Sequence, residues 1–241
     1  MIACTSLLSL QHLTISPIGS ERYLARAPLL PLSYDIDTSW RIPFLNHRDT
    51  KQPLSSHIWH DIKRDARNKA RQQRQRQRAG VRQLLQYLLG SLDIDDVLDD
   101  QQFPYRLAKT RYYVCFSHSQ TWVAVALSRT QAIGIDVEVQ PVKWQLAKRF
   151  YHADDIRQLA SLPTAQRTQV SQWLWQIKES GIKIHQYTLA QGLGIYYPDL
   201  VAALIRASTA SSDAPMLFTA HNHTIYITHN PSTTVVYTCA S

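Results

Sequence analysis

Two acidic side chains stand two positions apart in the stretch IGIDVEV, residues 133–139. Asp136 and Glu138 alternate there with β-branched apolar residues, a pattern that predicts a β-strand. Positions i and i+2 of a strand face the same side, about 6.5 Å apart. Two carboxylates facing one way suit a hard divalent cation such as Mg²⁺. Because the pattern is short and common, a strand edge with two solvated acids is the alternative.

A third carboxylate lies in WLWQIKESGIKI, residues 173–184. On a helix, Trp175, Glu179 and Lys183 follow one another at i, i+4 and i+8 and so share one ridge. A separate face carries an apolar stripe formed by Val170, Trp173, Leu174, Ile177 and Ile184. The helix therefore holds a carboxylate and an ammonium group together, either for chemistry or as an ordinary surface ion pair.

Ser117, His118 and Ser119 stand at the end of a third candidate element, the apolar strand that finishes in CFSHS. Hydroxyl groups, an imidazole and backbone N–H groups at a strand end can bind phosphate. The alternative is a structural histidine, which a lone histidine at a strand end often is.

Strands and helices must bring these residues together. Aromatic and β-branched runs predict strands over residues 112–116, 122–127 and 133–139. Helical periodicity follows over residues 143–163 and 165–187, with Pro163 between them. The alternating tail, 215–240, predicts paired strands joined at Asn230-Pro231, and the proline-rich first 60 residues predict short strands and turns.

The composition predicts a folded protein without a membrane span. The chain has 241 residues, 44% of them hydrophobic, which is enough for a substantial core. Its apolar runs are far shorter than the ~20 residues of a membrane helix, and its N-terminus lacks the pattern of a signal peptide, so we expect a cytoplasmic protein. The cysteines at positions 4, 115 and 239 form no metal-binding or disulfide pattern.

The net charge of +8 comes from one segment. Nine Lys and Arg residues oppose a single Asp between Lys63 and Arg82. The arginines recur every three or four positions, which predicts a helix with one basic face, and the leucine-rich end at 84–89 predicts where that helix docks. Like charges stacked in this way destabilise a helix, so we expect an anionic partner; a solvated charge run is the alternative.

The three motifs S-H-S, G-I-D-V-E and W-x-x-K-E-S-x-x-K occur here in a fixed order. In that order they resemble the 4′-phosphopantetheinyl transferases of the surfactin-synthetase-activating type, over about Arg64 to Gly194. The resemblance implies that Asp136, Glu138 and Glu179 hold Mg²⁺. It further implies coenzyme A contacts from Ser117, His118 and Lys183, and from Arg76 or Arg64 to the adenosine 3′-phosphate.

The resemblance also implies a reaction and a fold. A serine of an acidic acyl or peptidyl carrier protein would take the phosphopantetheine group from coenzyme A, releasing adenosine 3′,5′-bisphosphate. Glu179 or a bound water would accept the serine proton, and Lys183 would neutralise charge on the transferring phosphate. The implied fold is α+β, a monomeric pseudo-dimer of two similar subdomains, residues 1–140 and 141–241, with the site between them.

Other functions remain to be weighed against this one. An RNA- or DNA-binding module would use the basic helix but would leave the G-I-D-V-E and W-x-x-K-E-S motifs without a role. A metal-dependent nuclease would use Asp136, Glu138 and Gln140, although its first acid normally lies much further upstream. A zinc site from His221, His223 and His229 would lack a fourth ligand. Within the family, Cys115 and Gly181 depart from the usual residues.

Overall fold

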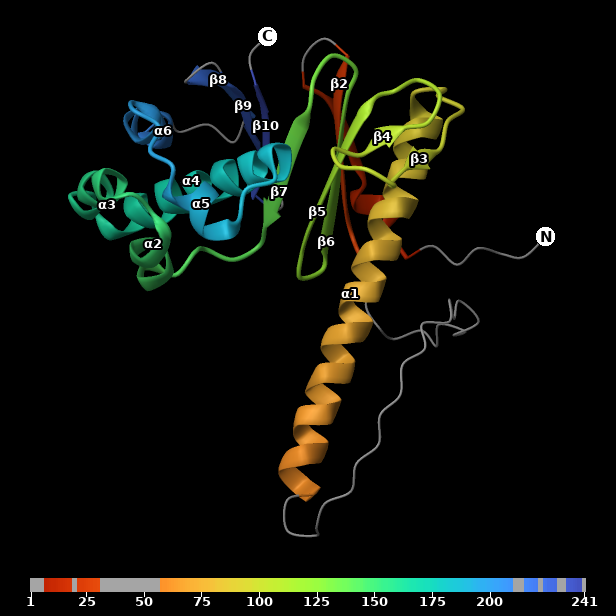
Figure 1. The fold of residues 1–241 in the computed structure, drawn as a ribbon, viewed down its shortest axis with the longest axis horizontal. Coiled ribbons are helices and arrows are strands. Elements are labelled where there is room, and N and C mark those ends of the chain that lie inside the picture. Colours follow the sequence, from red (N-terminus) through yellow and green to blue (C-terminus); the bar gives the residue numbers. More distant parts are fainter. Residues whose placement is uncertain are drawn as a thin grey trace.

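The computed structural model describes the backbone of residues 7–18, 21–30, 57–209, 215–220, 223–228 and 233–239. Side chains are described within these ranges except at residues 10, 57–66, 218, 220 and 233–239. The protein is α+β, as the resemblance implies, and its two antiparallel sheets lie between helices (Figure 1).

The first sheet has six strands in the order β1-β2-β6-β5-β4-β3. Its bounds are β1 Thr14–Pro17, β2 Arg22–Pro28, β3 Leu98–Asp99, β4 Arg106–Leu107, β5 Tyr113–Ser119 and β6 Trp122–Ser128, preceded by the short 3₁₀ helix η1 at Leu10–His12. The predicted strands at 112–116 and 122–127 are confirmed as β5 and β6. They pair directly, with Ser119 opposite Trp122 at the hairpin end.

The second sheet has four strands in the order β7-β10-β9-β8. Its bounds are β7 Ile133–Glu138, β8 Met216–Ala220, β9 His223–Thr228 and β10 Thr233–Cys239. The predicted strand at 133–139 is confirmed as β7, and β9 pairs with β10 as the alternating tail predicts. The joint predicted at Asn230-Pro231 lies outside the described residues.

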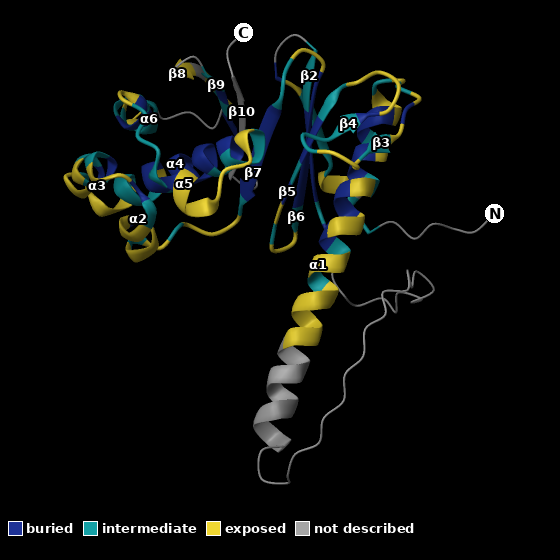
Figure 2. Cartoon of the chain, viewed as in Figure 1, coloured by how far each residue is buried: buried dark blue, intermediate teal, exposed yellow. Residues whose placement is uncertain are grey.

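The basic helix is α1, His57–Ser91. Its C-terminal half docks on the six-stranded sheet through the buried Leu84, Leu85, Leu88 and Leu89. Gly80 allows close approach, since a Cβ there would meet Leu29 Cδ2 at 2.5 Å. The preceding part of α1 extends past the sheets, and residues 67–79 within it are largely exposed (Figures 1 and 2). Docking at the leucine-rich end is thus confirmed.

The remaining helices cover the four-stranded sheet: α2 Trp144–Phe150, α3 Ala153–Ala160, α4 Thr164–His185, α5 Leu189–Gly194 and α6 Leu200–Thr209. The periodic segment 143–163 forms two helices because Tyr151 is extended and His152 caps α3, its imidazole accepting from Asp154 N. Helices α5 and α6 were not predicted, although Thr188 and Gln191 form a capping box at α5. No helix in the described residues is long and apolar enough to span a membrane.

Strand β7 joins the two sheets. It is an edge strand of its own sheet and lies against β5, β6 and α4. Ile133, Ile135 and Val137 pack onto the six-stranded sheet on the face away from α1. Although β7 precedes residue 141, it pairs within the sheet of the later strands. The division at 140/141 and the likeness of the two halves remain predictions.

Candidate active site

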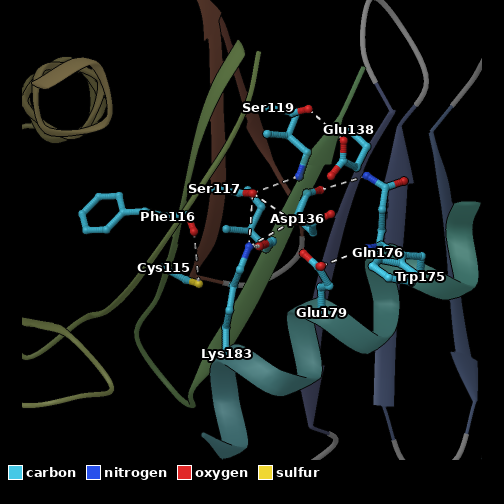
Figure 3. A network of polar contacts seen from close by, with 12 residues as sticks. Cys115, Phe116, Ser117, Ser119, Asp136, Glu138, Trp175, Gln176, Glu179 and Lys183 are labelled. Carbon is cyan, nitrogen blue, oxygen red and sulfur yellow. Dashed lines mark hydrogen bonds and ion pairs between the residues drawn. The ribbon is translucent and has the colours of Figure 1, made fainter. Parts of the chain in front are cut away.

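Three carboxylates face a common space between β7, β5 and α4 (Figure 3). Asp136 and Glu138 lie on the side of β7 that also carries Gly134, and Gly134 lies directly against α4. Glu179 extends from α4 toward them. Asp136 is buried, whereas Glu138 and Glu179 are half-buried. Two sequence motifs more than 40 residues apart therefore meet at one place.

The close contact between β7 and α4 depends on Gly134. A Cβ at this position would lie 2.1 Å from the backbone oxygen of Ser180 in α4. Because the obstacle is helix backbone, a larger residue would force the two elements apart. The glycine in G-I-D-V-E thus sets the distance between the acids of β7 and the ridge of α4.

Asp136 is the deepest of the three acids. Its Oδ1 accepts hydrogen bonds from Ser117 Oγ and from Lys183 Nζ, both at 3.0 Å. Its Oδ2 is buried and has no hydrogen-bond partner among the described residues. One oxygen of the carboxylate is therefore held firmly while the other is left for a further partner.

Lys183 extends from α4 to the edge of β7. Its Nζ also donates to Ile135 O at 2.7 Å and to Ser117 Oγ at 3.1 Å. Burial disfavours the charged form of Lys183, but Asp136, Cys115 and Glu179 together outweigh it, so the pKa of Lys183 lies above its ordinary value. The ammonium group therefore stays charged and compensates Asp136.

Glu138 and Glu179 each accept a hydrogen bond from a neutral donor. Ser119 Oγ donates to Glu138 Oε2 at 2.8 Å, and Trp175 Nε1 donates to Glu179 Oε1 at 2.9 Å. Burial and the negative charge of Asp136 raise the pKa of Glu138. Burial, then Asp136, raise the pKa of Glu179 to about 7. The charge of Asp136 thus disfavours ionisation of both Glu138 and Glu179 in the absence of a cation.

Ser117 and His118 face opposite sides of β5. Ser117 is buried: its hydroxyl donates to Asp136 and accepts from Lys183 and, at 3.2 Å, from the backbone N–H of Val137. Because successive side chains of a strand point to opposite faces, His118 lies on the side of β5 that faces α1, and it is exposed. Loss of water around its ring lowers the pKa of His118, and the charges of Lys183 and Arg78 act the same way. The structure brings Ser117 to the carboxylates but turns His118 away from them.

The two candidate arginines belong to α1, on the far side of the six-stranded sheet from the carboxylates. Arg76 is half-buried and donates a hydrogen bond to the backbone oxygen of Leu30. The side chain of Arg64 lies outside the described residues. Arg76 is not brought to the acids, and the assignment of Arg76 or Arg64 to the adenosine 3′-phosphate remains a prediction.

The donor types fit a divalent cation. Three carboxylates suit a hard ion, and the buried, unpartnered Asp136 Oδ2 is an oxygen that such an ion would satisfy. Within the described residues, no group of three or more His, Cys, Asp and Glu side chains is already arranged as a metal site. The residues therefore match a cation chemically.

Sequence reasoning did not predict the contacts of two residues in the site region. Ser119 was grouped with Ser117 and His118 as a phosphate-binding hydroxyl at the strand end, and its contact with an acid was not predicted, although it stands two positions after Ser117 and so shares its face. Lys178, beside Glu179, is buried and donates to Asp155 Oδ2 at 2.6 Å and to Leu193 O at 2.7 Å. Its ammonium group therefore ties α4 to α3 and α5 and is turned away from the carboxylates.

Comparisons with known proteins follow the same motifs. Residues 132–233 match the family model described as the 4′-phosphopantetheinyl transferase superfamily. The chain is 30% identical over 175 residues to the 4′-phosphopantetheinyl transferase HetI of a Nostoc species, covering 67% of this chain and 73% of the relative. β7, α4 and their three carboxylates all fall inside the matched segment.

Two further relatives match over shorter segments. The chain is 31% identical over 86 residues to the 4′-phosphopantetheinyl transferase psf-1 of Bacillus pumilus, covering 35% of this chain. It is 38% identical over 68 residues to the 4′-phosphopantetheinyl transferase Sfp of Bacillus subtilis, covering 28% of this chain. These matches span only 36% and 30% of the two relatives' own lengths.

Proposed function

Because the chain belongs to the 4′-phosphopantetheinyl transferase superfamily, we propose that it transfers the 4′-phosphopantetheine group of coenzyme A to a serine of an acyl or peptidyl carrier protein. The observation that carries the proposal is the meeting of Asp136, Glu138 and Glu179 with Lys183, from β7 and α4. Both elements lie within the matched family segment.

In the proposed reaction the serine oxygen attacks the β-phosphorus of coenzyme A. The bond from that phosphorus to the bridging oxygen breaks, and adenosine 3′,5′-bisphosphate leaves with the bond's electrons. Little covalent chemistry is asked of the protein, whose work is positioning and charge neutralisation. A site with three acids and one lysine is suited to this work only with added positive charge.

Asp136, Glu138 and Glu179 would hold Mg²⁺, and when bound the ion would neutralise charge on the pyrophosphate oxygens. Asp136 would bind it through Oδ2, since Oδ1 is engaged by Ser117 and Lys183. Trp175 would keep Glu179 oriented through its indole N–H. The ion would also relieve the mutual repulsion that raises the pKa values of Glu138 and Glu179.

Glu179 is the proposed acceptor of the serine proton, directly or through a water. Burial and the neighbouring acids raise its pKa to about 7 without a metal. Because a bound cation would lower that pKa and weaken the base, a bound water is the alternative acceptor. Lys183 is proposed to contact the transferring phosphate. Its ammonium group donates to three oxygens of the protein, so a phosphate oxygen would replace one of them.

The proposed coenzyme contacts also include Ser117, His118, Arg64 and Arg76. Ser117 would have to exchange one of its present hydrogen bonds, whereas Arg76 has further N–H groups besides the one that it donates to Leu30. His118 is exposed and lies within the electrostatic influence of Arg78. It is therefore free to meet an anion on the α1 side of β5.

An acidic carrier protein is the proposed partner, because α1 offers a basic face. Arg67, Arg71, Arg74 and Arg78 are exposed and form no ion pair within the described part of the chain. The side-chain amides of Gln73 and Gln77 in α1 both donate to Gln120 O, and Gln120 directly follows Ser119. The basic face therefore begins at the same end of β5 as the carboxylates.

Mass spectrometry of apo carrier proteins tests the proposal. After incubation with the enzyme, coenzyme A and Mg²⁺, we expect the carrier to gain the mass of phosphopantetheine, and we expect no gain with the Asp136→Ala variant. The proposal is contradicted if no member of a panel of acyl and peptidyl carrier proteins gains this mass. A shift of RNA in electrophoresis without such a gain would support the nucleic-acid alternative.

A further inference from the structure

We propose that Ser119 is a positioning residue that orients the Glu138 carboxylate for binding a divalent cation. The inference rests on the proposed function, because it assumes that Glu138 is a metal ligand. It starts from the hydrogen bond that Ser119 Oγ donates to Glu138 Oε2 at 2.8 Å (Figure 3).

The bond is one of two in which a serine of β5 donates to an acid of β7. Ser117 and Ser119 are two positions apart on β5, and Asp136 and Glu138 are two positions apart on β7. Ser117 Oγ donates to Asp136 and Ser119 Oγ donates to Glu138. Since β5 and β7 belong to different sheets, these side-chain bonds connect strands that are not paired through the backbone. Each acid of the D-x-E motif is thus matched by one serine.

The hydroxyl is committed to the carboxylate. A serine has a single O–H hydrogen, and that of Ser119 is donated to Glu138, so in this arrangement it cannot also donate to a phosphate. The residue therefore acts through Glu138 and does not itself contact the coenzyme. A neutral donor also orients an acid without adding a positive charge that would repel a cation.

Glu138 needs such a partner more than Asp136 does. It is half-buried at the last position of β7, and its long side chain has more rotamers to lose on binding than that of Asp136. It also stands two positions from Asp136 on the same side of the strand, so repulsion between the two carboxylates favours rotamers that turn Glu138 away. The bond to Ser119 opposes this, and its loss should weaken cation binding before any chemistry occurs.

Binding of Mn²⁺ to the protein without coenzyme A, followed by electron paramagnetic resonance, tests the inference. We expect Ser119→Ala to weaken Mn²⁺ binding by about 10- to 100-fold, as is typical for removing a partner that orients a metal ligand. Ser119→Thr retains the hydroxyl and should bind Mn²⁺ nearly as the wild type does. Ser128→Ala is the matched control, since Ser128 is buried in the neighbouring strand β6 and contacts none of the three acids.

A double-mutant cycle separates positioning from a general effect on folding. If Ser119 acts through Glu138, Ser119→Ala should cause no further loss of Mn²⁺ affinity when Glu138 is already Ala. An equal loss in both backgrounds, or unchanged affinity in the single variant, overturns the inference while leaving the proposed function intact. A wild-type protein that binds no Mn²⁺ would overturn the metal site itself, and the inference with it.

Discussion

Lys183 and Asp136 form an ion pair at the centre of the carboxylate cluster, with Nζ 3.0 Å from Oδ1. The Asp136 side chain is 4% exposed and that of Lys183 is 27% exposed, so the acid is the more deeply buried partner. The two residues come from the second and third motifs, 47 positions apart. The pair therefore compensates a buried charge and also fastens α4 to β7.

The first prediction concerns the stability that this pair provides. Lys183→Met leaves the buried Asp136 carboxylate without its cation and should lower the free energy of unfolding by about 1–3 kcal/mol. Adding Asp136→Asn removes the uncompensated charge and should recover most of that loss. Urea denaturation at pH 7 without divalent ions measures both changes. A double variant no more stable than Lys183→Met would show that the charge of Asp136 is not the cause.

The second prediction concerns the proposed role of Lys183 in transfer. A contact to the transferring phosphate strengthens as charge develops, so Lys183→Ala should lower kcat mainly, by about 10²- to 10³-fold as for the loss of one such donor. Steady-state kinetics with varied coenzyme A separates kcat from KM. A rise in KM alone would assign Lys183 to coenzyme binding in the ground state.

The third prediction tests the close contact between β7 and α4. Gly134→Ala places a methyl group against the backbone oxygen of Ser180 and should lower the free energy of unfolding by about 1–3 kcal/mol or more. Gly90→Ala is the control: nothing lies within 4 Å of a Cβ there, and the change should stabilise α1 by up to about 1 kcal/mol. Denaturation of both variants decides whether the clash, and not the loss of glycine as such, is responsible.

The fourth prediction follows from the raised pKa of Glu179. Burial, then Asp136, raise that pKa from 4.5 to about 7, so the folded protein binds a proton that the unfolded chain releases earlier. This stabilising contribution is complete below pH 4.5 and is lost as the pH rises to about 7 in the absence of metal. Glu179→Gln, which cannot ionise, should therefore gain stability relative to the wild type over this range. A difference that does not change with pH would contradict the shift.

The fifth prediction concerns the basic face of α1. Arg71→Ala and Arg74→Ala remove exposed charges and should slow association with an acidic carrier protein at low salt, by a factor that shrinks as salt is added. Gln72→Ala, a neutral and exposed neighbour on the same helix, should leave the rate unchanged. Stopped-flow association at several salt concentrations measures this, and equal salt dependence in all variants would assign the arginines elsewhere.

Local sequence patterns were sufficient for the elements that carry the site. Alternation with a period of two places Asp136 and Glu138 on one side of β7, and i, i+4 spacing places Glu179 and Lys183 on one ridge of α4. The leucines at the end of α1 likewise predicted where that helix docks. These features depend only on backbone geometry over a few residues, so they can be read without knowing the fold. The resemblance of the motifs then identified the family.

Only the tertiary structure decided which of these faces meet. It pairs Lys183 with Asp136, places Ser119 against Glu138, turns His118 and Arg76 away from the acids, and puts β7 in the sheet of the later strands. Each of these relationships joins residues that are distant in sequence, or depends on which side of a sheet is covered. Local patterns show which residues share a face of a strand or helix, but not which neighbour covers that face. Packing of the sheets and helices decides this, because the free energy of burial depends on the whole set of contacts.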